Sequence, residues 1–477
     1  MDRILKIISR YGIIAVLILA FILRFFWLAK SPPSLNWDET ALGYNAYLLL
    51  TTGRDEWGEK LPLFLRSFDD YKPAAYSYVT IPFIAALGLN ETTVRLPSVI
   101  AGTLTVLLIY LLAYELFKNK AVALLSSVLA SVEPWAIHFS RVAFEANLAL
   151  TFYLAGVYFL IKSKLKGVST YIGLFFLALS AYTYHAEKII ILPTILIFLL
   201  IYKANIKKVI TTTLIFLLPL GLYQLLHPET FARLGSTFLL KYPLERYFSY
   251  FSPVNLFVRG TPEPTQHIPD FGAFFVIEFF FWAIGAYHLI RNFKVNKLLF
   301  LLILVSPLPA VISFNWFYPA RVLPLFAFYS IVTAYGITKV KIRPLFWIAI
   351  AGFWLYLIFN LAANLLFYLP YMEHGNWQYG MKQMAQEVTK QQKNYSKIVI
   401  ETKTAQPHIF MLFYGAGRDQ EFRDVYWDKD KDLKSTLLVG PESSLPLEKV
   451  KSNPNINLVY DLKDYDGNLL YRLVGLK

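Results

Sequence analysis

Long apolar segments recur along most of the chain, and each is close to the ~20 residues that an α-helix needs to cross the hydrocarbon core of a membrane. Hydrophobic residues make up 56% of the 477 residues and charged residues only 16%. A soluble chain of this size would carry more charge, about 25%. The sequence therefore predicts an all-α polytopic membrane bundle.

The distribution of charge between the apolar segments indicates their topology. Lys and Arg fill alternate connections, which together contain a single acid, Asp2, whereas the other connections are mixed in sign. The positive-inside rule then places the N-terminus in the cytoplasm and the C-terminal tail outside. The net charge of +14 follows from these loops and does not indicate nucleic-acid binding. We expect about 11 transmembrane helices, at residues 11–29, 98–117, 120–137, 145–163, 169–184, 186–203, 208–226, 271–290, 297–313, 322–338 and 343–368.

Two loops and the tail are expected to lie outside. The first span is too long for a cleaved signal peptide and is expected to stay as an anchor. The stretch 74–88 is short and contains Pro82, so we expect an interfacial helix that keeps the whole loop 30–97 external. The loop 227–270 is external as well. We predict a transmembrane domain at 1–371 and a small external α/β domain at 372–477, with a helix at 376–392 and strands at 397–401, 436–439, 456–460 and 469–474.

Two adjacent carboxylates, Asp38 and Glu39, follow the first span and are the strongest candidates for chemistry. The predicted topology brings acids and bases from several connections to the same outer face. Moving a sugar off a lipid phosphate needs a carboxylate that takes a proton from the acceptor and cations that stabilise the departing phosphate. We expect Asp38 to be the base. The groups expected around the phosphate or sugar are Lys72, Arg141, Arg321 and His185.

Each of these residues also has a structural interpretation. Asp38 and Glu39 could cap a helix at 40–52, where the helix dipole favours acids. Lys72 could extend toward lipid headgroups, and arginines beside spans often act as anchors. The chain has no Cys, no His pair at helical spacing and no Gly-rich phosphate loop. We therefore expect no cofactor, with a divalent metal as the open alternative.

An ordered set of short motifs runs along the first three quarters of the chain. It comprises Trp37-Asp38-Glu39, Tyr71-Lys72-Pro73, Arg95-Leu96-Pro97-Ser98, Ser140-Arg141 and Pro319-Ala320-Arg321. This set resembles the C-type glycosyltransferases of the protein O-mannosyltransferase and aminoarabinose transferase group. The resemblance covers residues 10–370 and is densest in 30–145. The tail, which begins with Trp377-Gln378-Tyr379-Gly380, resembles the external domain of many bacterial members.

The resemblance implies a multi-pass enzyme of the cytoplasmic membrane, embedded in membrane lipids, with its C-terminal domain outside the cytoplasm. Such an enzyme takes a sugar from a polyprenyl-phosphate donor and transfers it, with inversion, to a hydroxyl of a lipid, glycan or protein. The resemblance makes Asp38 the base and Glu39 its acidic neighbour. It adds Arg95 and Glu145 to the donor site around Lys72, although the family's Lys-Pro-Pro is Lys-Pro-Ala here.

Two alternatives belong to other functional classes. The first is a transporter or flippase of a lipid-linked anionic substrate, which would need ionisable groups along a path through the bilayer. The second is a non-catalytic scaffold of the same fold. The concentration of acids and bases at one face, and their scarcity within the spans, favours the enzyme.

Overall fold

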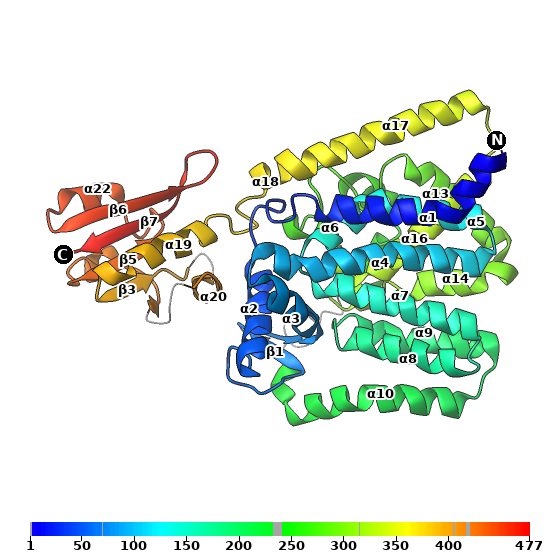
Figure 1. Ribbon diagram of the computed structural model, residues 1–477, viewed down its shortest axis with the longest axis horizontal. Coiled ribbons are helices and arrows are strands. Elements are labelled where there is room, and N and C mark those ends of the chain that lie inside the picture. The colour runs from blue at the N-terminus through cyan, green and yellow to red at the C-terminus, as the bar shows by residue number, and fades with distance from the viewer. Residues whose placement is uncertain (1, 69, 232–240, 314, 404–405, 416–419) are drawn as a thin grey trace.

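The computed structural model describes residues 2–68, 70–231, 241–313, 315–403, 406–415 and 420–477, except for the side chains of 2–10 and 295. It consists of a large helical bundle and a smaller α/β domain at one end of that bundle (Figure 1). Most of the bundle helices run side by side, with α10 and α17 on opposite flanks. The mostly helical fold with a small C-terminal sheet agrees with the predicted architecture, whereas the predicted orientation in the membrane stays a prediction.

Every expected span coincides with a helix or with consecutive helices. The corresponding elements are α1 (Asp2–Phe25), α4 (Glu91–Phe117), α5 (Lys120–Val132) with α6 (Pro134–Arg141), α7 (Glu145–Ser163), α8 (Val168–Ala181), α9 (Glu187–Tyr202), α10 (Ile206–Leu226), α13 (Glu278–Arg291), α14 (Phe293–Val305) with α15 (Leu308–Val311), α16 (Leu323–Ile337) and α17 (Pro344–Ala363).

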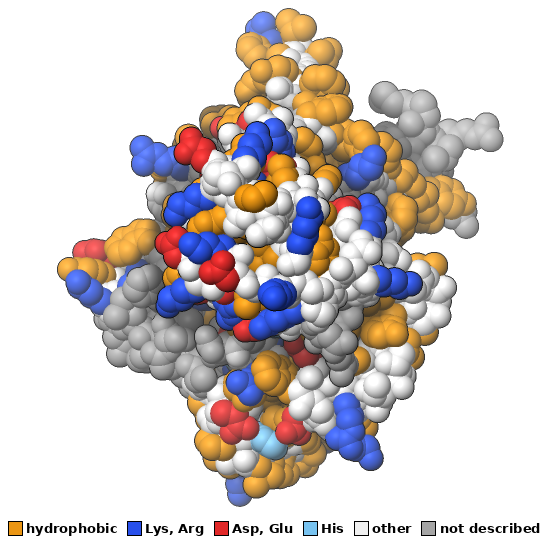
Figure 2. All heavy atoms as spheres, turned by 90° about the vertical axis from the view of Figure 1, so that its left-hand side faces the viewer, with side chains coloured by type: hydrophobic (Ala, Val, Ile, Leu, Met, Phe, Trp, Pro, Cys, Tyr) orange, Lys and Arg blue, Asp and Glu red, His pale blue; other side chains and the backbone are white. Residues whose placement is uncertain are grey.

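The lengths of these helices bear on the number of spans. Among the described residues, four segments are long and apolar enough to cross a membrane: α4, α7, α10 and the continuous segment Pro344–Met372. Two bent pairs raise this number to six, and α1, α3, α8 and α16 contain shorter apolar helices. Only 6% of the apolar window in Pro344–Met372 is buried, and hydrophobic side chains dominate the projection at the top of Figure 2, where α17 lies. The chain is a multi-pass membrane protein, and the number of 11 spans stays a prediction.

The first long loop, which is predicted to be external, folds into a layer across the end of the bundle (Figure 1). It contains α2 (Trp37–Thr52), the antiparallel hairpin of β1 (Phe64–Ser67) and β2 (Asp70–Pro73), and α3 (Ala75–Leu87), which includes Pro82. Asn36 caps α2 through its side chain, and Gly53 ends α2 in a left-handed conformation. The crosswise course of α2 fits the interfacial position expected for this loop.

The end of this loop differs from the prediction. We expected a span from residue 98, but α4 already begins at Glu91, because the Asn90 side chain accepts the Thr93 N–H as an N-cap. Arg95 therefore lies on the second turn of a helix rather than in a loop.

The long external loop consists of short elements in its described part. These are η1 (Pro228–Phe231), α12 (Pro243–Ser249), the π-helix η2 (Asn255–Arg259) and η3 (Pro264–Gln266), whereas residues 232–240 lie outside the described residues. A further short helix, η4 (Pro319–Arg321), precedes α16. The elements η3 and η4 reach the end of the bundle that carries α2, since residues of both line one cavity with Asp38.

The C-terminal domain follows η5 (Asn364–Tyr368) and α18 (Leu369–Met372). Its five-stranded sheet has the order β4-β3-β5-β7-β6. The predicted helix is α19 (Met381–Gln391), and the predicted strands are β3 (Lys397–Ile400), β5 (Thr436–Gly440), β6 (Ile456–Lys463) and β7 (Leu469–Leu476). The sequence analysis missed four short elements, α20 (Pro407–Phe413), β4 (Gln420–Phe422), α21 (Trp427–Asp430) and α22 (Leu447–Ser452).

The C-terminal domain is packed against the loop layer through polar and apolar contacts. Helix α20 contacts α2, and apolar residues of both helices share one buried cluster. Glu91 at the start of α4 accepts hydrogen bonds from Lys382 and Tyr414, at 2.6 and 3.0 Å. Trp377 is fully buried and its ring stacks on Phe144, with a centroid distance of 6.4 Å. These contacts place the domain directly over the first external loop.

Helices α13 and α16 cross where Gly285 of α13 and Gly336 of α16 face each other. A Cβ atom at Gly285 would lie 2.0 Å from the Val332 carbonyl oxygen, whereas one at Gly352 on α17 would meet nothing within 4 Å. Small residues allow membrane helices to approach closely. We therefore predict that Gly285→Ala lowers stability by about 1–3 kcal/mol, because the helices must separate. Thermal unfolding of the detergent-solubilised protein tests this, with Gly352→Ala as the control, and equal stability of the two variants would contradict it.

Candidate functional site

A cavity of about 440 Å³ opens where the loop layer, the bundle and the C-terminal domain meet. Asp38 and Lys72 come from the first loop and Glu145 from the start of α7. Figure 2 views the molecule from this end, with the C-terminal domain in front and basic and acidic side chains mixed over its surface. The remaining lining residues are Asn36, Trp37, Phe144, Ala146, Tyr184, Glu263, Pro264, Thr265, Gln266, Tyr318, Ala320, Gly375, Asn376 and Gln378.

Asp38 and Lys72 form an ion pair on the wall of this cavity. Asp38 occupies the second position of α2, and Lys72 lies opposite Leu65 in the β1–β2 hairpin. The Lys72 side chain is only 9% exposed, whereas the Asp38 side chain is 39% exposed. A buried ammonium needs an anionic partner, and Asp38 provides it. The carboxylate remains open to molecules that enter the cavity.

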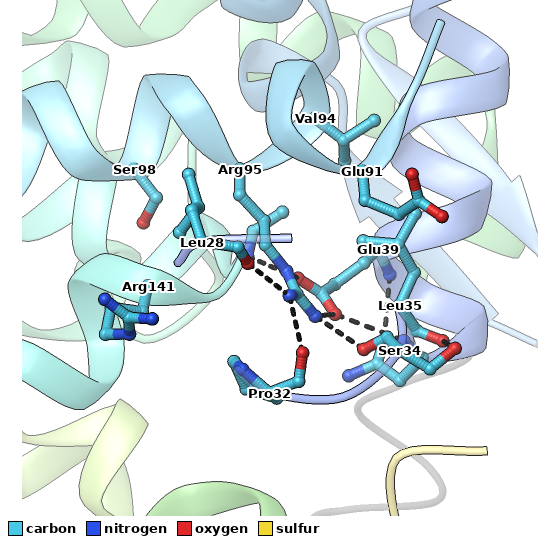
Figure 3. A network of polar contacts seen from close by, with 12 residues as sticks. Leu28, Pro32, Ser34, Leu35, Glu39, Glu91, Val94, Arg95, Ser98 and Arg141 are labelled. Carbon is cyan, nitrogen blue, oxygen red and sulfur yellow. Dashed lines mark hydrogen bonds and ion pairs between the residues drawn. The ribbon is translucent and has the colours of Figure 1, made fainter. Parts of the chain in front are cut away.

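Glu39 is directed away from the cavity into a buried network (Figure 3). Its carboxylate accepts two hydrogen bonds from Arg95, at 2.8 and 2.9 Å, and one each from the Asn36 and Ala143 N–H groups. The Arg95 side chain and the Glu39 carboxylate are fully buried. Both carboxylate oxygens are thus occupied by donors of the protein itself. Glu39 positions α2 instead of joining Asp38 at the cavity.

Arg95 has no donor left for a phosphate. Besides Glu39, its guanidinium donates to the carbonyl oxygens of Leu28, Pro32 and Ser34, at 2.9, 3.0 and 2.5 Å. Together with the two hydrogen bonds to Glu39, these contacts use all five N–H groups of the Arg95 guanidinium. Figure 3 shows Arg95 at the centre of these contacts. Arg95 therefore holds the segment between α1 and α2, instead of contacting the donor phosphate as expected.

Arg141 is likewise committed to the backbone. It is 2% exposed and donates to the carbonyl oxygens of Leu23, Arg24, Phe26 and Ser31, at 2.8–3.2 Å. It therefore satisfies carbonyl groups at the C-terminal end of α1, which have no partner within the helix. Arg141 does not line the cavity, and its expected contact with a phosphate is replaced by this capping contact.

The other predicted site residues lie at or next to the cavity. Glu145 lines it, as expected. His185 does not line it but contacts the Tyr71 carbonyl oxygen through Nε2 at 2.9 Å, so it supports the residue before Lys72. Arg321 lies 4.4 Å from the centre of the Tyr318 ring and donates to Asn315 at 3.3 Å. Its neighbours Tyr318 and Ala320 line the cavity.

The sequence analysis missed several polar lining residues. Glu263 comes from the long external loop, where its carboxylate accepts a hydrogen bond from Asn315 at 2.6 Å. Asn376 and Gln378 come from the first turn of the C-terminal domain. The Gly375-Asn376 pair marks a turn, but the sequence gives no sign that this turn reaches α2 from more than 300 residues away.

The charged residues of the lining are three acids and one base. Among the described residues of the lining, Asp38, Glu145 and Glu263 are acidic and only Lys72 is basic, so a phosphate would depend on Lys72 for its direct counter-charge. Within the described residues, no group of three or more His, Asp or Glu side chains has the arrangement of a metal site. The expectation that the protein works without a metal stays a prediction.

Two comparisons concern the sequence. A family model described as dolichyl-phosphate-mannose-protein mannosyltransferase matches residues 71–225. This stretch begins at the Tyr71-Lys72-Pro73 motif and ends within α10. A search of curated protein sequences found no match.

Comparison with solved structures covers nearly the whole chain. ArnT from Cupriavidus metallidurans in the apo state gives a TM-score of 0.62 at 11% identity, over 97% of this chain and 96% of that chain. The same protein bound to undecaprenyl phosphate gives 0.64 at 10% identity, over 97% and 98%. The apo oligosaccharyltransferase of Archaeoglobus fulgidus gives 0.52 at 11% identity, over 91% and 70%.

Over nearly its whole length the chain has the fold of ArnT, and part of it matches the mannosyltransferase family model. The match to ArnT includes the C-terminal domain, because almost all of both chains superpose. At this level of identity the superposition concerns the fold alone. The roles of individual residues in this chain therefore follow from the contacts described above.

The buried pair of Glu39 and Arg95 gives a stability prediction. Replacing Arg95 with Met removes the cation and its two hydrogen bonds from the buried Glu39 carboxylate, and it removes the Arg95 donors from three backbone carbonyl groups. We expect a loss of about 3–5 kcal/mol, since removal of one partner leaves an uncompensated buried charge. Thermal unfolding in detergent measures this loss. Arg54→Met, at an arginine of the same loop that donates to one exposed carbonyl, is the control, and equal stability would refute the proposed scaffold role.

Proposed function

We propose that the protein is a membrane glycosyltransferase that moves a sugar from a polyprenyl-phosphate donor to a hydroxyl acceptor at the extracytoplasmic face of the cytoplasmic membrane. The observation that carries this proposal is the ion pair of Asp38 and Lys72 on the wall of the 440 Å³ cavity. It provides a proton acceptor and a phosphate ligand side by side. The undecaprenyl phosphate bound to ArnT of Cupriavidus metallidurans supports a lipid-phosphate donor.

The proposed reaction is a single displacement. The acceptor oxygen attacks the anomeric carbon of the sugar, a new C–O bond forms, and the bond from that carbon to the phosphate oxygen breaks. Asp38 takes the proton of the attacking hydroxyl. The polyprenyl phosphate leaves with the electron pair of the broken bond, and Lys72 stabilises its growing negative charge. Attack from the face opposite the phosphate inverts the anomeric configuration.

The pairing of Asp38 with Lys72 links donor binding to the activation of the base. In the free protein the ammonium of Lys72 is paired with the Asp38 carboxylate. A phosphate that binds Lys72 competes for the same ammonium. The Asp38 carboxylate is thereby freed from Lys72 when the donor is bound, and it then lies next to the sugar that is to be transferred. The partial exposure of Asp38 and the burial of Lys72 agree with this division of roles.

The other lining residues contribute hydrogen bonds around the sugar and the acceptor. Glu145 and Glu263 accept hydrogen bonds from hydroxyl groups, and Tyr184 presents an aromatic side chain to the same space. Arg321 lies behind Tyr318, one residue from the lining, and adds positive charge on that side. The identities of sugar and acceptor would be determined by these groups.

Replacing Asp38 with Asn tests the base. We expect transfer to fall by about 10²–10⁴-fold, because the amide takes up no proton, while donor binding is retained. Membranes or purified protein are incubated with labelled polyprenyl-phosphate sugars, and the label that leaves the lipid is measured. Asp70→Asn, in the same loop but outside the cavity lining, serves as control. Near-normal turnover by Asp38→Asn would refute the assignment, and movement of intact labelled lipid across the bilayer without transfer would favour a transporter.

Replacing Lys72 with Met tests the phosphate contact. We expect the affinity for the donor lipid to fall by about 10–100-fold, since a charge-assisted hydrogen bond to the phosphate is lost. Binding of a polyprenyl phosphate without sugar measures the effect independently of transfer. Lys60→Met, at an exposed lysine of the same loop, is the matched control. Equal affinities in the two variants would show that the phosphate binds elsewhere.

A further inference from the structure

The N-terminus of α2 receives a hydrogen bond from the other end of the chain. The backbone N–H of Trp37 donates to the side-chain oxygen of Gln378 in the C-terminal domain, at 2.8 Å. Trp37 is the first residue of α2, and Asp38 is the second. The first amide groups of a helix have no partner within the helix. The side-chain oxygen of Asn36 accepts a hydrogen bond from the Glu39 N–H, and that of Gln378 accepts one from the Trp37 N–H.

The turn that carries Gln378 is held rigidly on both sides. Trp377 is fully buried and its ring stacks on Phe144, which precedes α7. Tyr379 stacks on Tyr465 of the β6–β7 hairpin, with a centroid distance of 4.6 Å. Gln378 itself has φ of +49°, which is unusual for a residue with a side chain. This conformation is maintained between two anchored aromatic rings, so the Gln378 side chain starts from a fixed position.

The orientation of the Gln378 amide follows from this contact. The Trp37 N–H is a donor, so the oxygen of Gln378 must face it, and the amide nitrogen takes the other position. Gln378 lines the same cavity as Asp38. Within the described part of the chain, its Nε2 group makes no hydrogen bond. One side chain thus fixes the start of α2 with its oxygen and leaves an NH₂ donor available at the cavity.

We infer that Gln378 is a positioning residue for Asp38, through which the C-terminal domain becomes part of the transfer site. Its Oε1 atom fixes the first turn of α2 and so the carboxylate one residue further on. Its Nε2 group donates to an oxygen of the bound donor, either a sugar hydroxyl or the phosphate. The kinetic part of this inference rests on the proposed function, whereas the contact to Trp37 is independent of it.

Three full-length variants separate the two roles. Gln378→Met keeps the length of the side chain and removes both hydrogen-bonding groups. Gln378→Glu keeps an oxygen acceptor for the Trp37 N–H but removes the NH₂ donor and adds a negative charge. Gln392→Met is the matched control, because Gln392 is a half-buried glutamine of the same domain that makes no side-chain hydrogen bond among the described residues and does not line the cavity.

Hydrogen exchange at the Trp37 amide provides the first measurement. Loss of its acceptor is expected to speed exchange about tenfold in Gln378→Met, with no change in Gln378→Glu or Gln392→Met. Transfer kinetics provide the second measurement. Gln378→Met should lower kcat about tenfold, because Asp38 is less well placed, and Gln378→Glu should mainly raise KM for the donor.

The outcomes distinguish this inference from the proposed function. Unchanged Trp37 exchange in Gln378→Met would overturn the positioning role, and so would unchanged kcat in a variant with faster exchange. If Gln378→Met does not fold, equal Trp37 exchange and equal KM for Gln378→Glu and the wild-type protein would confine Gln378 to a structural role and overturn the inference. If the wild-type protein transfers no sugar, the proposed function fails, while exchange at Trp37 still decides whether Gln378 holds α2.

Discussion

The buried ion pair between Glu39 and Arg95 determines the shape of the whole outer end of the molecule. It joins α2 to α4, and the remaining donors of Arg95 hold the chain between Leu28 and Ser34. Burying two charges costs several kcal/mol per ion unless the pair is also fully hydrogen-bonded. Here every donor of the guanidinium has an acceptor. The pair therefore favours one geometry over others, and this geometry turns α2 across the end of the bundle with Asp38 facing the cavity.

Three separate parts of the chain contribute to the environment of Asp38. The Glu39–Arg95 network fixes α2 against α4. The β1–β2 hairpin contributes Lys72, and the C-terminal domain contributes Gln378, which accepts the first N–H of α2. Contacts between α20 and α2 and from Lys382 and Tyr414 to Glu91 keep that domain in register with the loop layer. A base must be held within hydrogen-bonding reach of its substrate. The C-terminal domain is thus a structural element of the candidate site and more than an appendage to the helical bundle.

The sequence predicted the parts of this structure that depend on local patterns. Long apolar segments identified the bundle helices, and alternating short strands identified most of the C-terminal sheet. Asp38, Lys72 and Glu145 could be selected as candidates because their residue types suit the chemistry, and all three line one cavity. The roles of Arg95 and Arg141 could not, since an arginine that binds phosphate and one that binds backbone carbonyls look the same in sequence. Gln378 was missed because its partner is 341 residues away, and such a tertiary contact leaves no local signal.

The excess of acids around the cavity places a physical constraint on any reaction there. Lys72 is the one basic residue of the lining in the described part of the chain, and it is buried. A buried ammonium needs an anionic partner, and this partner is Asp38 in the structure. In the proposed reaction, the donor phosphate takes the place of Asp38 as that partner. The exchange of one anion for the other leaves the charge of Lys72 compensated at every stage. On this proposal, the Asp38 carboxylate leaves its ion pair with Lys72 only when a donor sugar occupies the cavity.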